Sequence, residues 1–283
     1  MKKRPYGRHG DMISLVALGA IVVKGLPQDE ADAIVAEAFE AGVNYIDVAP
    51  VYGDPEVLLG PALDPFPRDE YFLACKTARR DAKGAREELE RSLERLHTDY
   101  LDLYQLHNCS SDKDIEKTLG PDGALEVFVQ AKEQGLVRHI GFSTHREEAG
   151  LRLLDAYDFE SALFPVNWVC MLKGTFGQDL LDRCKQDGVT ALALKAMARC
   201  EWDKEEHPEY PNAWYRPETR PEISALALRF TLGLGVTAAV PPGDPGLWRH
   251  AVEVAENYEP LDPAELAKLK EAAEDIEPLF PKR

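Results

Sequence analysis

The chain has 283 residues, of which 45% are hydrophobic, and a formal net charge of −17. This length allows a substantial core, and because α/β barrels of similar length form one unit, we expect a single domain over residues 1–283. The negative charge disfavours nonspecific attraction to nucleic acid or to anionic membranes. The longest apolar stretch, residues 225–240, is interrupted by Arg229, Gly233 and Gly235, so we expect no membrane span.

The cysteines and the N-terminus indicate the compartment. Five cysteines are widely spaced and form no CxxC pair, which argues against a disulfide framework or a zinc knuckle. The first residues are basic, but no apolar segment of a secretory signal follows them. We therefore expect a cytoplasmic protein.

Strand-like and helix-like segments alternate along the chain. Eight short apolar runs are the expected strands: 12–18, 45–47, 71–76, 100–106, 139–143, 162–167, 190–194 and 236–240. Segments with helical periodicity lie between them: 27–41, 56–63, 85–96, 123–133, 147–156, 176–186 and 223–232. Two more helices follow the last strand, at 247–256 and 262–276, and Asp262, Pro263 and Glu265 form a helix-start signature for the second.

This alternation is compatible with an open doubly wound sheet or with a closed (β/α)₈ barrel. No Gly-x-Gly-x-x-Gly motif follows a strand, so the dinucleotide-binding fingerprint of the open sheet is missing. Asp47, Lys76, His107 and Ser143 fall at or just beyond the carboxyl ends of different strands, and in a barrel these ends converge on one mouth. We therefore predict a parallel eight-stranded TIM barrel.

Two connections are longer than usual. Residues 107–121 follow the fourth strand and residues 196–221 follow the seventh, and loops of this length are commonly functional lids or disordered segments. The second loop carries Trp202, Trp214 and Tyr215, which we predict to line a substrate pocket, although aromatic residues can also anchor a lid on the surface.

Four of the strand-end and loop residues have complementary chemistry. Tyr52 carries a phenol with an ordinary pKa of about 10. Lys76 ends an apolar strand, where its charge needs a partner such as Asp47. An ammonium beside Tyr52 would lower the pKa of the phenol and make it a proton donor near neutral pH, while His107 could orient a substrate oxygen. Singly, each residue has a structural explanation; together at one barrel face they indicate an active site.

These residues resemble the catalytic tetrad of the aldo-keto reductases. The resemblance lies in Asn44-Tyr45-Ile46-Asp47 with Tyr52-Gly53, in Lys76, in Asp102 to His107, and in Gly135 to Ser143 and Val240 to Gly243. It implies a (β/α)₈ barrel that transfers hydride between a nicotinamide and a carbonyl, with Tyr52 as general acid, Lys76 and Asp47 tuning it, and His107 polarising the oxygen. The implied partner is a small carbonyl or alcohol.

The resemblance also implies cofactor contacts, with departures from the family pattern. Ser143 matches a carboxamide-binding serine, but Thr144 replaces the asparagine that usually follows it. Trp168 stands where a glutamine is expected, and Asn167 beside it is a candidate replacement. Lys195 resembles a variant branch in which a lysine could reach the cofactor pyrophosphate.

The segment after the eighth strand bears on the choice between NADP and NAD. Pro242 and Gly243 fall where this strand meets the cofactor in the family. Arg249 is the only cation in residues 241–249 that could bind a 2′-phosphate, and Asp244 would repel one. The resemblance favours NADP, and NAD is not excluded.

Two other classes of function remain open at this stage. A nicotinamide-binding sensor or regulatory subunit could keep the barrel after losing catalysis, as the altered cofactor contacts suggest. A metal-dependent lyase would need clustered His and acidic ligands, of which only Asp47 and His107 qualify, and we predict no metal site.

Overall fold

A parallel sheet of eight strands forms the centre of the molecule. The computed structural model describes residues 1–8, 10–203 and 209–281. The strands are β3 (Leu18–Gly19), β4 (Tyr45–Asp47), β5 (Phe72–Thr77), β6 (Leu101–Leu106), β7 (Val137–Ser143), β8 (Ser161–Pro165), β9 (Thr190–Leu194) and β12 (Ala238–Val240). They are hydrogen-bonded in the order β12-β9-β8-β7-β6-β5-β4-β3. A parallel bridge between Val16 and Ala239 joins the two edges, which confirms the predicted barrel.

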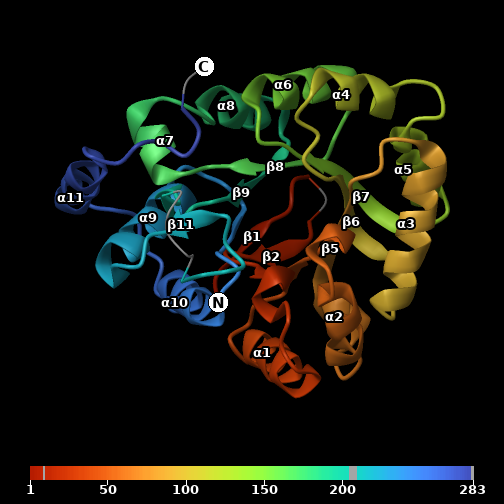
Figure 1. Ribbon diagram of the computed structural model, residues 1–283, viewed down its shortest axis with the longest axis horizontal. Helices are drawn as coiled ribbons and strands as arrows, with labels where there is room; N and C mark the ends of the chain where they lie inside the picture. Colours follow the sequence, from red (N-terminus) through yellow and green to blue (C-terminus); the bar gives the residue numbers. More distant parts are fainter. Residues whose placement is uncertain (9, 204–208, 282–283) are drawn as a thin grey trace.

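Helices surround the sheet on the outside (Figure 1). They are α1 (Gln28–Glu40), α2 (Pro55–Leu63), α3 (Ala82–Arg95), α4 (Asp112–Leu119), α5 (Ala124–Glu133), α6 (Glu147–Ala156), α7 (Trp168–Lys173), α8 (Gln178–Asp187), α9 (Pro221–Gly233), α10 (Pro245–Glu256) and α11 (Pro263–Ala273). Asp262 and Glu265 form the predicted capping box at the start of α11. No helix in the described ranges is both long and apolar enough to cross a membrane.

The first predicted strand, residues 12–18, is wrong as a single element. Its first part is β2 (Met12–Ser14), which pairs antiparallel with β1 (Lys3–Pro5), whereas the later part joins the barrel through the bridge at Val16 and through β3. A bend at Leu15 separates the two parts, and the hydroxyl of Ser14 donates a hydrogen bond across it to the carbonyl of Val16, at 2.7 Å. The β1–β2 hairpin lies across the centre of the ring of strands in Figure 1.

Both long loops contain regular structure that the sequence did not predict. The first contains α4, whose start is capped by Ser111 accepting from the amide of Asp114 at 3.1 Å. The second contains an antiparallel pair, β10 (Ala198–Glu201) and β11 (Tyr215–Pro217). Residues 204–208 of this predicted loop lie outside the described residues.

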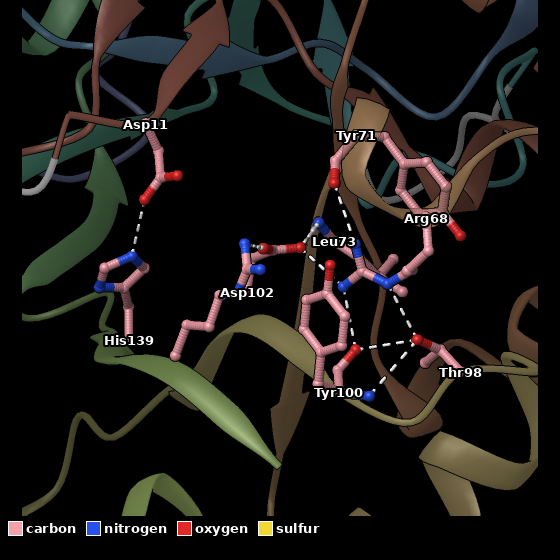
Figure 2. A network of polar contacts seen from close by, with 9 residues as sticks. Asp11, Arg68, Tyr71, Leu73, Thr98, Tyr100, Asp102 and His139 are labelled. Carbon is pink, nitrogen blue, oxygen red and sulfur yellow. Dashed lines mark hydrogen bonds and ion pairs between the residues drawn. The ribbon is translucent and has the colours of Figure 1, made fainter. Parts of the chain in front are cut away.

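Asp102 on β6 holds neighbouring strands together (Figure 2). Its side chain is buried and accepts hydrogen bonds from the amide of Leu73 at 2.8 Å, from Arg68 at 2.7 Å and from Arg138 at 3.0 Å. Arg68 also donates to the carbonyls of Tyr71 and Tyr100. One carboxylate therefore links strands β5, β6 and β7 and the turn that precedes β5.

Asp102→Ala is expected to lower the free energy of unfolding by about 2–4 kcal/mol, because it leaves the buried amide of Leu73 and the guanidinium of Arg68 without this partner. Urea titration measures the change. The matched control is Glu87→Ala, which removes a carboxylate from an exposed pair with Lys83 and should change stability by no more than about 0.5 kcal/mol. Equal losses in the two variants would contradict this role of Asp102.

Candidate active site

A cavity of 290 Å³ opens at the carboxyl ends of the barrel strands. It is lined by Gly19, Ala20, Ile21, Asp47, Val51, Tyr52, Lys76, His107, Ser143, His145, Leu163, Leu194, Lys195, Asn212, Trp214, Tyr215, Val240, Pro241 and Gly243. All four predicted catalytic residues are among them. They meet because parallel strands in a barrel direct their carboxyl ends toward one mouth.

Lys76 is the centre of a buried polar cluster. Its ammonium donates hydrogen bonds to the carboxylate of Asp47, to the carbonyl of Val48 at 3.2 Å and to the hydroxyl of Tyr52 at 3.3 Å. Burial alone would lower the pKa of Lys76, but Asp47 and Tyr52 outweigh it and hold this pKa above its ordinary value. The lysine therefore stays charged in the barrel although it is only 1% exposed.

Tyr52 lies on the short 3₁₀ turn η2 (Pro50–Tyr52) after β4. Gly53 ends the turn with a φ of 105°, a conformation that favours glycine, and the turn places the phenol against Lys76. Burial raises the pKa of Tyr52, and although Lys76 opposes this effect, the net change is upward. The expectation that Lys76 would bring this pKa below its ordinary value is wrong, because the loss of hydration on burial is the larger effect.

His107 follows β6 and faces the same cavity. Its ring is edge-on to that of Tyr52, with centroids 5.6 Å apart and an interplanar angle of 87°. Arg80 fixes its backbone by donating to its carbonyl at 2.6 Å, and its own amide donates to Thr77. Burial, with a further contribution from Lys76, lowers the pKa of His107 to about 3. Its buried Nδ1 has no hydrogen-bond partner within the described residues. The ring is therefore a neutral imidazole with a free hydrogen-bonding atom.

The low pKa of His107 predicts a pH dependence of stability. The unfolded chain binds a proton at this histidine below its ordinary pKa of about 6.5, whereas the folded chain does so only near pH 3. Unfolding is therefore favoured as the pH falls through this interval. Urea titrations at about pH 7 and about pH 5 should show a smaller loss of stability for His107→Gln than for the wild type. Identical losses would show that His107 is not buried as a neutral ring.

Of the predicted carboxamide contacts after β7, Ser143 lines the cavity and Thr144 does not. The Ser143 hydroxyl accepts from the amide of Asn108 at 2.8 Å. The Thr144 hydroxyl is paired with Ser110 and accepts from the amide of Arg146. The next residue, His145, lines the cavity but was not predicted; its Nε2 is buried without a described partner, and burial lowers its pKa to about 4. Its position directly after Ser143 and Thr144, beyond the end of a predicted strand, is the feature of the sequence that could have identified it as a site residue.

Asn167 and Trp168 support the site from outside the cavity. Asn167 caps α7 and donates to the carbonyls of Lys195 at 2.9 Å and Ala198 at 2.7 Å. The indole of Trp168 donates to the same carbonyl of Ala198 at 2.9 Å. Both side chains are therefore occupied by the turn after β9, which presents Lys195 to the cavity.

Of the predicted residues after β12, only Gly243 lines the cavity, and Pro242 lies beside it. Arg249, on α10, donates to both carboxylate oxygens of Glu37, at 2.8 and 2.9 Å. Asp244 caps the start of the same helix by accepting from the amide of Leu247. The structure therefore places Arg249 in a salt bridge rather than in the cavity.

Two of the three predicted pocket aromatics reach the cavity. Trp214 is 53% exposed at the rim, and Tyr215 is buried in the wall. Trp202 instead donates to the carbonyl of Ala213 and lines a separate cavity of 620 Å³ beside the C-terminal segment. The apolar lining residues, such as Leu163 and Val240, carried no signal in the sequence beyond their place on strands.

Within residues 1–8, 10–203 and 209–281, no three His, Cys, Asp or Glu side chains are grouped as metal ligands. The site consists of a lysine paired with a carboxylate, a phenol that is hydrogen-bonded to that lysine, and a neutral imidazole. On a (β/α)₈ barrel, this combination is typical of an active site that transfers a proton.

Comparison with known proteins identifies the family. The aldo/keto reductase family model matches residues 16–267, so this chain belongs to that family. D-arabinose 1-dehydrogenase of Saccharomyces cerevisiae is 37% identical over 149 residues, which are 46% of this chain and 43% of that protein. An aldo-keto reductase of Bacillus subtilis is 36% identical over 200 residues, 65% of this chain and 56% of that protein.

The chain spans about half the length of the curated relatives it matches. A solved structure of an aldo-keto reductase from Bacillus halodurans, in its holo form, superposes with a TM-score of 0.75 over 96% of each chain at 24% identity. This likeness supports the fold.

Proposed function

We propose that this protein is an NAD(P)H-dependent oxidoreductase that reduces an aldehyde or ketone to the alcohol, or catalyses the reverse reaction. The observation that carries the proposal is the position of the Lys76 ammonium between the carboxylate of Asp47 and the hydroxyl of Tyr52, in a cavity that His107 also lines. Membership of the aldo/keto reductase family supports it.

The lining of the cavity fits a nicotinamide. Leu163, Leu194 and Val240 offer apolar surface for a flat ring, and the Ser143 hydroxyl offers a polar contact for the carboxamide. Two imidazole nitrogens, Nδ1 of His107 and Nε2 of His145, are buried without described partners. When bound, the nicotinamide supplies or accepts the hydride. We assign direct contacts to Ser143 and Gly243, and assign to Thr144, Asn167 and Pro242 the support of the backbone around them.

The side chains of the site supply the proton transfer. His107, as a neutral ring, donates a hydrogen bond to the carbonyl oxygen and orients it. Tyr52 donates its proton to that oxygen as negative charge develops there. Lys76 stabilises the phenolate left on Tyr52, and Asp47 keeps Lys76 charged. In the reverse direction the phenolate of Tyr52 accepts the proton from the alcohol.

The choice between NADP and NAD depends on residues other than those that transfer the proton. The resemblance favours NADP, which needs a cation for the 2′-phosphate. Arg249 is engaged with Glu37, and Asp244 adds a negative charge nearby, so neither supports phosphate binding. We propose NADP as the cofactor on the basis of the family resemblance. To bind the 2′-phosphate, Arg249 would have to break its salt bridge with Glu37. The ratio of kcat/KM for NADPH to that for NADH measures the preference.

The direct test is an assay of the purified protein against a panel of aldehydes and ketones with NADPH and with NADH, following the absorbance of the reduced nicotinamide. We expect turnover with at least one pair. Binding of the cofactor without turnover on any compound would contradict the proposal and favour a nicotinamide-binding sensor or regulatory subunit.

A further inference from the structure

Lys195 is a second lysine in the cavity, and no acidic side chain among the described residues forms a salt bridge with it. Its side chain is partly buried at the end of β9 and lines the same cavity as Tyr52 and His107. Within the described residues its ammonium makes no ion pair; it lies against two aromatic rings, 5.3 Å from the centroid of Trp214 and 5.0 Å from that of Tyr215. Aromatic faces attract a cation but do not neutralise it.

The backbone of Lys195 is held in an uncommon conformation. Its φ is 64°, in the left-handed region, which disfavours residues that have a Cβ. Asn167 holds the Lys195 carbonyl, which also accepts from the amide of Ala198 at 3.0 Å. Backbone conformations of this kind are maintained by surrounding contacts and are concentrated at functional sites. The contacts here fix the direction in which the lysine leaves β9.

Among the described residues that line the cavity, the charges add to one uncompensated positive charge. Asp47 and Lys76 cancel each other. Low pKa values keep His107 and His145 neutral, and burial raises the pKa values of Tyr52 and Tyr215, so that both phenols are also neutral. Burial, with a further contribution from Lys76, lowers the pKa of Lys195 to about 8, so most molecules carry this charge at neutral pH. A chain with a net charge of −17 thus presents a positive cavity.

We propose that Lys195 binds a carboxylate carried by the carbonyl substrate, so that the protein prefers carbonyl acids to their neutral esters. An unpaired, partly desolvated ammonium gains most from an anionic ligand. Because the cavity is only 290 Å³ and also contains Tyr52 and His107, a small molecule can place its carbonyl near those two residues and its carboxylate near Lys195. Trp214 and Tyr215 then cover the body of the molecule. This inference rests on the proposed reductase function.

The test compares 4-formylbenzoate with its methyl ester, which share the aldehyde and the aromatic body and differ in charge. For the wild type we expect a higher kcat/KM for the acid. Lys195→Met should lower the ratio of acid to ester by about tenfold to a hundredfold, as expected for loss of a charged hydrogen bond. Lys195→Arg should retain much of the preference. Lys83→Met removes an exposed lysine on α3 and should leave the ratio unchanged.

Two further measurements separate this proposal from its rivals. The first is the affinity of each variant for NADPH and NADH. If Lys195→Met weakens cofactor binding tenfold and leaves the acid-to-ester ratio unchanged, the lysine serves the cofactor phosphates, and the proposal is overturned. The second is calorimetric binding of 4-formylbenzoate and its ester in the presence of oxidised cofactor, which needs no turnover. If neither aldehyde is reduced, tighter binding of the acid that depends on Lys195 still supports the anion site, although the reductase function fails. Equal binding, or none, overturns it.

Discussion

Replacing Tyr52 with phenylalanine is expected to lower kcat for carbonyl reduction by about 10²–10⁴-fold, the usual contribution of a positioned general acid. The phenol is the proposed proton donor, and it is the only hydroxyl that hydrogen-bonds to the ammonium of Lys76 within the described residues. Phenylalanine keeps the ring, and with it the edge-on packing against His107. The loss should therefore fall on the chemical step, with a smaller effect on KM.

Two controls define this result. Thermal unfolding should show that Tyr52→Phe remains folded, since the variant removes one hydrogen bond of 3.3 Å. Tyr157→Phe removes a phenol at the end of α6, just before β8 begins, and should retain wild-type kcat. Undiminished turnover in Tyr52→Phe would mean that the proton comes from another group, and the proposed mechanism would then be wrong.

The positions of the candidate catalytic residues could be predicted because they depend on a regular feature. Alternating strands and helices predict a parallel barrel. A polar residue at the carboxyl end of an apolar strand must then lie at the mouth of that barrel. Asp47, Lys76 and His107 were found in this way, as was the candidate cofactor contact Ser143, and all four line the cavity. That they act as proposed remains a prediction.

Contacts between loops could not be predicted in this way. Asn167 was expected to touch the cofactor, but its amide reaches the carbonyls of Lys195 and Ala198, which depends on how the chain turns after β9. The salt bridge of Arg249 joins residues 212 positions apart, from α10 to α1. Neither the partners of Asn167 nor the partner of Arg249 can be recognised in the sequence from periodicity or from a motif.

The direction of a pKa shift also needs the structure. The nearness of Lys76 to Tyr52 could be inferred from strand ends, and an ammonium beside a phenol lowers its pKa. The degree of burial could not be inferred, and burial is the larger effect on Tyr52. We therefore propose that Tyr52 is a neutral phenol before the reaction. It gives up its proton only as the carbonyl oxygen gains negative charge, and Lys76 stabilises the phenolate that remains.

Replacing Lys76 with methionine is expected to remove activity and also to lower the free energy of unfolding by about 3–5 kcal/mol. The ammonium is the strongest partner of the buried carboxylate of Asp47, which otherwise accepts, within the described residues, only weak side-chain hydrogen bonds of 3.4 Å from Tyr45 and Gln105. Without Lys76, the carboxylate must stay charged without a counter-ion or take up a proton. Denaturant titration measures the stability, and the carbonyl assay measures the activity.

The double variant Asp47→Asn with Lys76→Met separates the two roles of the pair. Removing both charges leaves no unpaired ion, so most of the lost stability should return, and the two single changes should be strongly non-additive. Activity should not return, because Tyr52 then has no cation to stabilise its phenolate. A stable double variant with wild-type turnover would show that the buried ion pair only supports the fold. A stable but inactive one would show that its charge is needed for proton transfer.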